Sequence, residues 1–380
     1  MIKSCPVCSK KKFKNIFSHN RVPEYLLNYS NNFHDALTYK SVPVNFVECI
    51  ECGFLFNKIN TQLSYSTEYD ANRSFSKEFN NYLNDIISYL EFNIFKKYKI
   101  SNILEIGHGD GILLKNIFNL KKYNFKNIIG YDPSGHLSHK NNQKTLKFFK
   151  KYYTKKNIVK PDLVILRHTL EHISNVKNFL KLILNENPKF VFIEVPCKTF
   201  VYNGNIHYYS NEHCSYFDYY SLQVLLKFFG YKKYTMKKAF NDENLISIFI
   251  KSDEKIEVAD VADNNPISNP KQNLVKFKKQ IINNFNFKYD FFWGAAGKGV
   301  MVLNMLNITY KQVPYIVDVN ENIQGKFISL SGTEIISQHS LQKYIHSKSK
   351  IFIMNKVYKD EIKKILLKLK IKNKVYSLFH

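Results

Sequence analysis

The segment Asn102-Ile-Leu-Glu-Ile-Gly-His-Gly-Asp-Gly111 is the most informative stretch of this chain for its fold. Its first five residues form a short, mostly apolar run, and Gly107, Gly109 and Gly111 then stand at alternate positions. Glycine lets the backbone turn sharply and lets a ligand approach without a clash with a Cβ atom. A helix that follows would begin with free backbone N–H groups. The segment therefore predicts a strand, a ligand-binding loop and a helix.

Two carboxylates indicate which ligand this loop binds. Glu105 stands inside the motif, and Asp132 ends the next predicted strand, where a carboxylate can hold the hydroxyls of a ribose. A dinucleotide loop would have its third glycine one residue later and would not need Glu105. We therefore expect S-adenosyl-L-methionine rather than NAD, held by Glu105, Gly107, Gly109, Gly111 and Asp132.

Strands and helices alternate on both sides of this loop. Apolar runs predict strands over residues 102–106, 127–131, 162–166 and 190–195, with helices over 113–120 and 176–184. Alternation of this kind predicts an α/β fold, a doubly wound parallel sheet with helices on both faces. A second α/β unit follows, with strands over 290–293, 313–317, 350–354 and 374–378, a glycine loop over 294–299 and helices over 300–306 and 360–369.

Four cysteines near the N-terminus predict a metal site. They form two knuckles of the same spacing, Cys5-Pro-Val-Cys8 and Cys49-Ile-Glu-Cys52. Four thiolates complete a tetrahedral structural Zn²⁺ site, which has no open position for chemistry. His19 and His34 lie between the knuckles, but the ligand count is already complete, so we expect them at the surface. Cys197 and Cys214 lie among apolar residues, where small buried side chains are expected rather than nucleophiles.

The positions of these motifs divide the chain into domains. We expect a zinc-binding lobe over 1–72, a core over 73–250, a polar linker over 251–275 that contains Pro266 and Pro270, and a C-terminal Rossmann-like domain over 276–380. Apolar residues at three- and four-residue spacing predict a long helix over 75–98 at the start of the core.

The composition narrows the classes of partner. The formal charge is +25, but only Arg21, Arg73 and Arg167 are arginines and the lysines are dispersed, which favours solvated faces over a nucleic-acid groove. Such a surface would still attract an anionic substrate. No run reaches the roughly 18 apolar residues of a membrane helix, and the first residues lack a secretory pattern. We expect a cytoplasmic protein with no membrane partner, a monomer or a weak dimer.

Further motifs give the chain a family resemblance. They are Leu170-Glu-His-Ile173, Glu194-Val-Pro196, Asn211-Glu-His-Cys-Ser-Tyr-Phe217, Gly294-Ala-Ala-Gly-Lys-Gly299, Gln324-Gly-Lys326 and Asn355. In this order, with the two knuckles and the loop at Gly107, the chain resembles the bacterial C-methyltransferases of nucleotide-linked deoxysugars. That family methylates carbon 3 of a 4-keto sugar. The resemblance implies a zinc-binding N-terminal domain, a class I methyltransferase core and a Rossmann-like C-terminal domain.

The resemblance also implies catalytic residues. A glutamate–histidine pair and a histidine after the fourth strand surround the reacting carbon in that family, which carries over to Glu212, His213 and His172. A tyrosine of the zinc lobe is also implied, either Tyr69 or Tyr65. His168 stands where the family has an asparagine, and we expect it on the cofactor side. Two further departures are Ser210-Asn211 for Tyr-His and Asn72-Arg73-Ser74 for Tyr-x-Ser.

The chemistry of C-methylation explains why such residues are needed. A 4-keto group makes the neighbouring C–H acidic enough for a positioned base, and histidine titrates near neutral pH. We expect His213 as the base, Glu212 as its orienting partner, and His172 or Tyr69 as the donor to the enolate oxygen. The substrate would be a nucleotide-diphosphate sugar. The alternatives are an O- or N-methyltransferase of a related glycan precursor, and a zinc-knuckle RNA-binding protein with a degenerate methyltransferase core.

Overall fold

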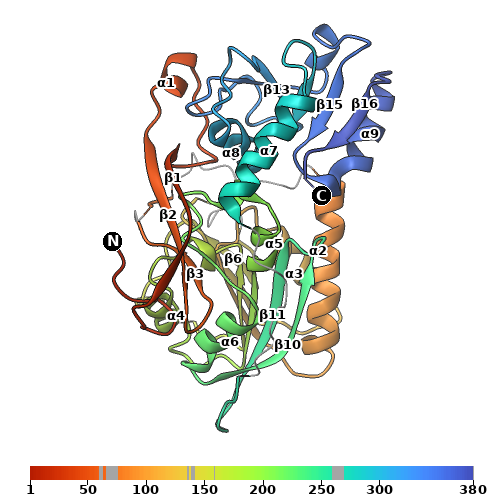
Figure 1. Ribbon diagram of the computed structural model, residues 1–380. Coiled ribbons are helices and arrows are strands. Elements are labelled where there is room, and N and C mark those ends of the chain that lie inside the picture. The colour runs from red at the N-terminus through yellow and green to blue at the C-terminus, as the bar shows by residue number, and fades with distance from the viewer. Residues whose placement is uncertain are drawn as a thin grey trace.

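The strands of this protein form three sheets in three packed units (Figure 1). The structure is a computed structural model that describes residues 1–59, 63–65, 76–134, 137, 142–157, 159–258 and 269–379. The N-terminal lobe lies at the left of Figure 1, the central unit lies below, and the C-terminal unit lies at the top.

The central unit contains a seven-stranded sheet in the order β10-β11-β8-β7-β4-β5-β6. Its strands are β4 (Asn102–Ile106), β5 (Asn127–Tyr131), β6 (Leu146–Phe149), β7 (Leu163–Arg167), β8 (Phe190–Pro196), β10 (Tyr231–Ala239) and β11 (Asn244–Lys251). Strands β4 to β8 are parallel, but β11 runs antiparallel to β8 and pairs with β10 in a hairpin. The sheet is therefore mixed and not wholly parallel as predicted, and this strand order is that of the class I methyltransferases.

Helices cover both faces of the central sheet, as the alternation predicts. They are α2 (Lys77–Leu90), α3 (Ile112–Phe118), α4 (Val176–Ile183), α5 (Lys198–Tyr202) and α6 (Tyr219–Lys227), with short 3₁₀ turns at Leu170–His172 and Ile206–Tyr208. One core cluster contains residues of α2 and α3, and another contains residues of α4 and α6. The Ser76 side chain caps α2, and a π-helical turn over Glu91–Phe95 follows it, so the predicted helix over 75–98 is divided in two.

The N-terminal lobe is completed by a strand from the central unit. Its sheet has the order β1-β2-β3-β9, made of β1 (Phe13–Pro23), β2 (Ser41–Cys49), β3 (Leu55–Asn57) and β9 (Ser215–Tyr216), with helix α1 (Phe33–Leu37) between β1 and β2. Strand β9 directly follows the predicted catalytic pair, so this pairing fixes the pair against the lobe. The sequence did not predict this pairing, because it joins residues about 160 positions apart.

The C-terminal unit has a five-stranded parallel sheet in the order β14-β13-β12-β15-β16. Its elements are α7 (Pro270–Asn284), β12 (Phe291–Trp293), α8 (Gly297–Met305), β13 (Tyr315–Val317), β14 (Glu334–Ile336), β15 (Lys350–Ile353), α9 (Lys359–Lys368) and β16 (Lys374–Ser377), with 3₁₀ turns at Ser340–Lys343 and Lys356–Tyr358. Helix α7 begins inside the predicted linker, because Asn269 caps a helix whose first residue is Pro270.

Specific contacts join the three units. Glu361 of α9 caps the N-terminus of α2, where it accepts hydrogen bonds from Ser76 Oγ at 2.8 Å and Lys77 N at 3.1 Å. Ser30 of the lobe pairs with Phe327 of the C-terminal unit. One apolar cluster contains residues of all three units, among them Phe46, Tyr216 and Met301. Hydrogen bonds and a shared apolar core therefore fix the three units to one another.

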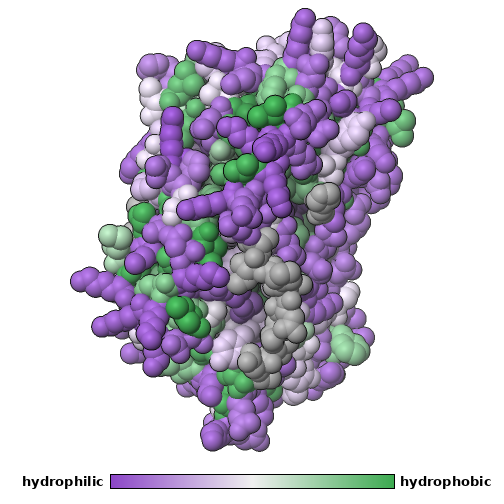
Figure 2. Space-filling model, in the orientation of Figure 1, coloured by the Kyte–Doolittle hydropathy of each residue, from purple (hydrophilic) through white to green (hydrophobic). Residues whose placement is uncertain are grey.

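The face of the molecule seen in Figure 2 is mostly hydrophilic. Figure 2 shows hydrophilic side chains spread over all three units on the face in view, with apolar side chains in small separate groups. Within the described ranges of the chain, no helix combines the length and the apolar character that a membrane span requires.

Candidate functional site

The four knuckle cysteines converge on one point of the N-terminal lobe. Cys5 Sγ lies 3.6 Å from Cys52 Sγ, and Cys8 Sγ lies 3.4 Å from Cys49 Sγ, with all four sulfur atoms within 4.8 Å of one another. A tetrahedral ion with Zn–S bonds of about 2.3 Å separates its sulfurs by roughly 3.8 Å, so this set fits zinc. None of the cysteines is in a disulfide. The predicted ligand set is compatible with a structural zinc ion.

The predicted cofactor loop connects β4 to α3 at the carboxyl edge of the central sheet. Gly107, Gly109 and Gly111 all have positive φ, at 79°, 56° and 69°, which explains why glycine occupies these positions. Gly109 N donates to Asp132 Oδ2 over 2.8 Å. A Cβ atom at Gly109 would meet nothing within 4 Å among the described residues, so the loop faces open space.

Buried polar atoms surround this loop. Glu105 is 1% exposed, and burial raises its pKa to about 8, so the carboxyl group is mainly protonated at neutral pH. Glu105 Oε2 and His108 Nε2 have no hydrogen-bond partner among the residues that the structure describes. Unsatisfied buried polar atoms are costly and are expected where a ligand completes the site. These residues therefore fit a polar cofactor such as adenosylmethionine.

A row of alternating charges lies at the carboxyl ends of β7 and β8. Arg167 Nε lies 2.6 Å from Glu194 Oε2, His168 Nε2 lies 3.1 Å from Glu194 Oε1, and His168 Nδ1 lies 3.3 Å from Glu171 Oε1. We call Arg167, Glu194, His168 and Glu171 the buried charge network. Burial opposes a charge on His168, but the attraction of Glu194 and the hydrogen bond to Glu171 outweigh it and raise the pKa of His168 to about 9. Both ring nitrogens of His168 thus meet carboxylates, and its predicted contact with the cofactor stays a prediction.

The two predicted catalytic histidines lie side by side. The ring centroids of His172 and His213 are 4.9 Å apart and the rings are nearly perpendicular. A carboxylate oxygen of Glu171 and one nitrogen of each ring lie within 4.8 Å of one another. The site thus unites the 3₁₀ turn after β7 with the segment before β9, as the resemblance implies.

Tyrosines hold both histidine rings. Tyr65 Oη lies 2.8 Å from His172 Nδ1, and Tyr216 Oη lies 3.0 Å from His213 Nδ1. Burial, reinforced by the negative charge of Glu212, raises the pKa of Tyr65 well above its usual range, so this phenol keeps its proton. Tyr69, the other tyrosine expected in this role, lies outside the described residues.

Glu212 makes a different contact from the one expected. Its Oε1 accepts a hydrogen bond from Leu26 N of the N-terminal lobe at 2.5 Å, whereas the residue on His213 Nδ1 is Tyr216. The family resemblance pointed to Glu212 as the partner of His213, and the sequence analysis missed Tyr216. Spacing could have indicated Tyr216, since it stands three residues after His213 in the same motif.

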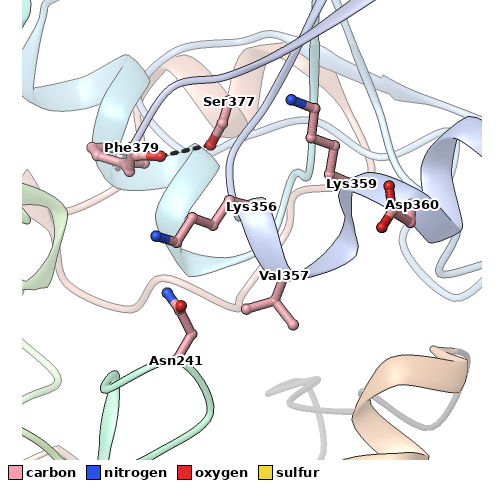
Figure 3. Close-up of a pocket in the computed structure, with 7 residues that line it drawn as sticks. All are labelled: Asn241, Lys356, Val357, Lys359, Asp360, Ser377 and Phe379. Atoms are coloured by element: carbon pink, nitrogen blue, oxygen red, sulfur yellow. Dashed lines mark hydrogen bonds between the residues drawn. The ribbon is translucent and has the colours of Figure 1, made fainter.

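The C-terminal glycine loop is joined to the central unit by Lys298. Its Nζ lies 2.8 Å from Glu243 Oε2, and Asn355 Nδ2 donates to the same oxygen over 3.2 Å. Next to these residues is a hollow of about 570 Å³ between the β10–β11 turn and α9 (Figure 3). It is lined by Asn241, Lys356, Val357, Lys359, Asp360, Ser377 and Phe379.

Two family models match the chain. Residues 75–235 match the methyltransferase domain family, and residues 265–372 match the C-methyltransferase C-terminal domain. The first interval contains the loop of β4 and both catalytic histidine candidates, and the second contains most of the C-terminal unit. The matches and the strand order agree on a class I methyltransferase domain followed by a domain found in C-methyltransferases.

Solved structures resemble part of this chain at low sequence identity. The methyltransferase domain of bacterial CtHen1 is 17% identical, with 46% of this chain and 100% of that chain covered and a TM-score of 0.36. The magnesium protoporphyrin IX methyltransferase of Synechocystis PCC 6803 is 12% identical, with coverages of 46% and 84% and a TM-score of 0.36. Human N-acetylserotonin methyltransferase is 16% identical, with coverages of 46% and 55% and a TM-score of 0.34. No curated protein matches the chain.

Proposed function

We propose that this adenosylmethionine-dependent methyltransferase methylates the carbon next to the keto group of a nucleotide-linked deoxysugar, carbon 3 of a 4-keto sugar. The observation that carries the proposal is the pair of adjacent histidines, His172 and His213, each held by a tyrosine, in a chain with a C-methyltransferase C-terminal domain. Methylation of carbon needs a base to remove a C–H proton and a donor to the enolate oxygen, and this pair offers both.

The hydrogen bonds around His213 identify its basic nitrogen. The Tyr216 hydroxyl donates its proton to the carbonyl oxygen of Tyr208. Tyr216 Oη therefore accepts the hydrogen bond it shares with His213 Nδ1, so Nδ1 carries the ring proton. The lone pair of a neutral His213 is then on Nε2, and we assign proton abstraction to that atom.

The other members of the site support the resulting enolate. Tyr65 keeps its proton, so it can donate to His172 or to the enolate oxygen. Adenosylmethionine, when bound, supplies an electrophilic methyl group. Gly107, Gly109, Gly111 and Asp132 would hold it at the edge of the central sheet. The zinc site is closed and has no part in the chemistry.

The hollow of Figure 3 supports an anionic substrate. Lys356 of the 3₁₀ turn before α9 and Lys359 at the start of α9 line it, together with one acidic residue, Asp360. Lysines at such a position suit the diphosphate of a nucleotide sugar, since the charge attraction is stronger in a partly enclosed site than in bulk water. We propose that the nucleotide part of the substrate lies toward this hollow and that the sugar lies toward His213.

The experiment follows proton abstraction separately from methyl transfer. The purified protein is incubated in D₂O with nucleotide 4-keto sugars and no methyl donor, and exchange at carbon 3 is followed by NMR. We expect exchange in the wild-type protein and a loss of about 10²–10⁴-fold in His213→Asn, the range for a missing general base. The exposed His34 provides the control variant His34→Asn, which should exchange at the wild-type rate.

A second measurement adds the methyl donor and follows mass. A gain of one methyl group on a keto sugar, retained after reduction of the ketone, supports C-methylation. Methyl gain on a hydroxyl or amino group, with no exchange at carbon 3, would favour the O- or N-methyltransferase alternative. Normal exchange and methylation in both His213→Asn and His172→Asn would refute the assignment of the base.

A further inference from the structure

The buried charge network has an order that points toward the proposed base. Along the row the charges are positive at Arg167, negative at Glu194, positive at His168 and negative at Glu171. Tyr82 and Asn244 also donate to Glu194, at 2.7 and 2.9 Å, and fix its carboxylate. The row ends at Glu171, next to His172 and His213.

Glu171 has an oxygen that the rest of the network does not use. Its side chain is fully buried, and Oε1 is the oxygen near His168 Nδ1. The other oxygen, Oε2, has no hydrogen-bond partner within the described part of the chain. A buried carboxylate oxygen without a partner destabilises the folded protein, because it has lost its hydrogen bonds to water. Such an atom is expected where a positive charge or a donor arises during function.

We propose that Glu171 stabilises the imidazolium that forms on His213 during proton abstraction, and that His168 is the positioning residue that holds Glu171 for this task. The inference rests on the proposed function of His213. In the step concerned, the C–H bond of the sugar breaks, its proton moves to His213 Nε2, and the electron pair stays in the enolate. The new positive charge continues the alternation of the row, within 4.8 Å of a carboxylate oxygen of Glu171.

The charge on His168 supports this order. The attraction of Glu194 and the hydrogen bond to Glu171 outweigh its burial and raise its pKa to about 9, so His168 is positively charged at neutral pH and lies between two carboxyl groups. Two histidines and a carboxylate are also a set that binds transition metals. A divalent ion would add two charges near the His168 imidazolium, whereas protonation of His213 adds one, so the network favours the proton.

Other groups near Glu171 could share its effect. Its charge acts on Tyr65, Cys214 and Tyr216, and burial keeps all three of these groups protonated. Glu212 is a second carboxylate near Cys214 and Tyr65, but its Oε1 is bound to Leu26 N. Glu171 Oε2 has no partner among the described residues, so Glu171 has an oxygen that can meet a new cation.

The test compares charge with shape at position 171. Glu171→Gln keeps the shape and removes the charge, and Glu171→Asp keeps the charge and shortens the side chain. Glu91→Gln is the matched control. Glu91 lies on the π-helical turn after α2 and pairs with Lys122, which is not part of the buried charge network. The titration of the His213 ring is followed by NMR in the protein without substrate, together with carbon-3 exchange against pH, thermal unfolding and adenosylhomocysteine affinity.

We expect the titration midpoint of His213 and the acidic limb of the exchange profile to move to lower pH in Glu171→Gln. The exchange rate at high pH should fall about 100-fold, the effect of one charge lost at this distance in a partly polar environment. Glu171→Asp should restore most of both, and Glu91→Gln should change neither. Adenosylhomocysteine affinity should stay at the wild-type value in all three variants.

Two results would overturn the inference. The first is an unchanged His213 midpoint in a folded Glu171→Gln protein, or an equal loss in Glu171→Asp, which would indicate packing rather than charge. The second is a second equivalent of zinc in the wild-type protein that Glu171→Gln loses. If His213 responds to Glu171 but the wild-type protein exchanges no keto sugar, the proposed function fails while the coupling stands.

Discussion

The central and C-terminal sheets each have a glycine loop, and the two loops are built alike but surrounded differently. In the central unit Gly109 N donates to Asp132 over 2.8 Å, and in the C-terminal unit Ala295 N donates to Asp318 over 2.7 Å. Both aspartates follow the neighbouring parallel strand, which brings each of them to the same edge as its loop.

The neighbours of the loops differ. Among the described residues a Cβ atom at Gly109 would meet nothing within 4 Å, whereas one at Gly297 would lie 3.4 Å from Leu26 of the N-terminal lobe. Tyr29 Oη also donates to Ala295 O over 3.3 Å, and Lys298 pairs with Glu243 of the central unit. The first loop has room for a ligand at Gly109, although not at Gly107 or Gly111, and the second loop joins the units. A glycine loop thus indicates how the backbone turns, and the packing around it decides whether a ligand can reach it.

Loss of zinc is the largest effect that we expect, and it should separate the two loops. Leu26 and Tyr29 belong to the N-terminal lobe, where zinc is expected, so Cys52→Ser should expose the second loop and leave the first intact. The free energy of unfolding should fall by about 5 kcal/mol or more, because zinc binding in such sites is folding energy. Zinc content and thermal unfolding measure this, with the exposed neighbour in Glu51→Gln as control. Retained zinc with all four cysteines freely reactive would contradict it.

Glu105 gives the first loop a titrating group that the second loop lacks, and this group should make the stability of the protein depend on pH. Glu105 stands two residues before Gly107, and the matching position before Gly294 in the second loop is the buried Phe292. The carboxyl group of Glu105 keeps its proton up to a pKa of about 8 when folded, against an ordinary value of 4.5. The folded state therefore binds more protons between these values, and the free energy of unfolding should fall by about 1.4 kcal/mol for each pH unit.

Denaturant unfolding of Glu105→Gln between pH 5 and pH 9 tests this dependence. The variant should lose the decline below about pH 6.5, and Glu91→Gln should retain it. Above that pH the raised pKa of His168, about 9, gives a second decline that both variants should keep. A decline of the same slope in Glu105→Gln would assign the effect to other groups.

Glycine-to-alanine exchanges should affect the two loops in different ways. A Cβ atom at Gly299 would lie 2.1 Å from Gly294 O, so Gly299→Ala must move backbone and should cost about 3 kcal/mol of stability. Gly109→Ala meets open space but has a φ of 56°, which costs about 1–2 kcal/mol, and it should also weaken adenosylhomocysteine binding. Calorimetry and urea unfolding distinguish the two. Equal ligand affinities in both variants would mean that the first loop is not the cofactor site.

Replacing the aspartate beside each loop, Asp132 or Asp318, should give the smallest effects and the most direct comparison of the two loops. Asp132→Ala should weaken adenosylhomocysteine binding by about 1.5–3 kcal/mol, the range for a hydrogen bond to a charged group. Asp318→Ala should leave that affinity unchanged and lower stability, because Ala295 N loses its buried acceptor. Tight NAD binding would contradict the cofactor assignment. A loss of adenosylhomocysteine affinity in Asp318→Ala but not in Asp132→Ala would mean that the second loop binds the cofactor.

Local patterns explain most of what could be predicted. The run before Gly107 predicted β4, Asn127 to Tyr131 predicted β5, and the knuckle spacing predicted the cysteine cluster. Helix α7 was missed because Pro270 was interpreted as a linker residue, although proline also suits the first position of a helix. Strand β10 was missed because it is lysine-rich and lacks a clear alternation, and its apolar partner β11 was not assigned either.

The sequence by itself determined the strand–loop–helix units, the cysteine set and the residue types of the site, because these depend on chemistry repeated over a few neighbouring positions. Only the tertiary structure decided which of them meet. It brought Tyr65 to His172 and Tyr216 to His213, and it turned Glu212 toward Leu26. It also closed the second glycine loop with Leu26, Tyr29 and Glu243. Contacts between residues far apart in sequence depend on how whole units pack, and no local pattern contains that information.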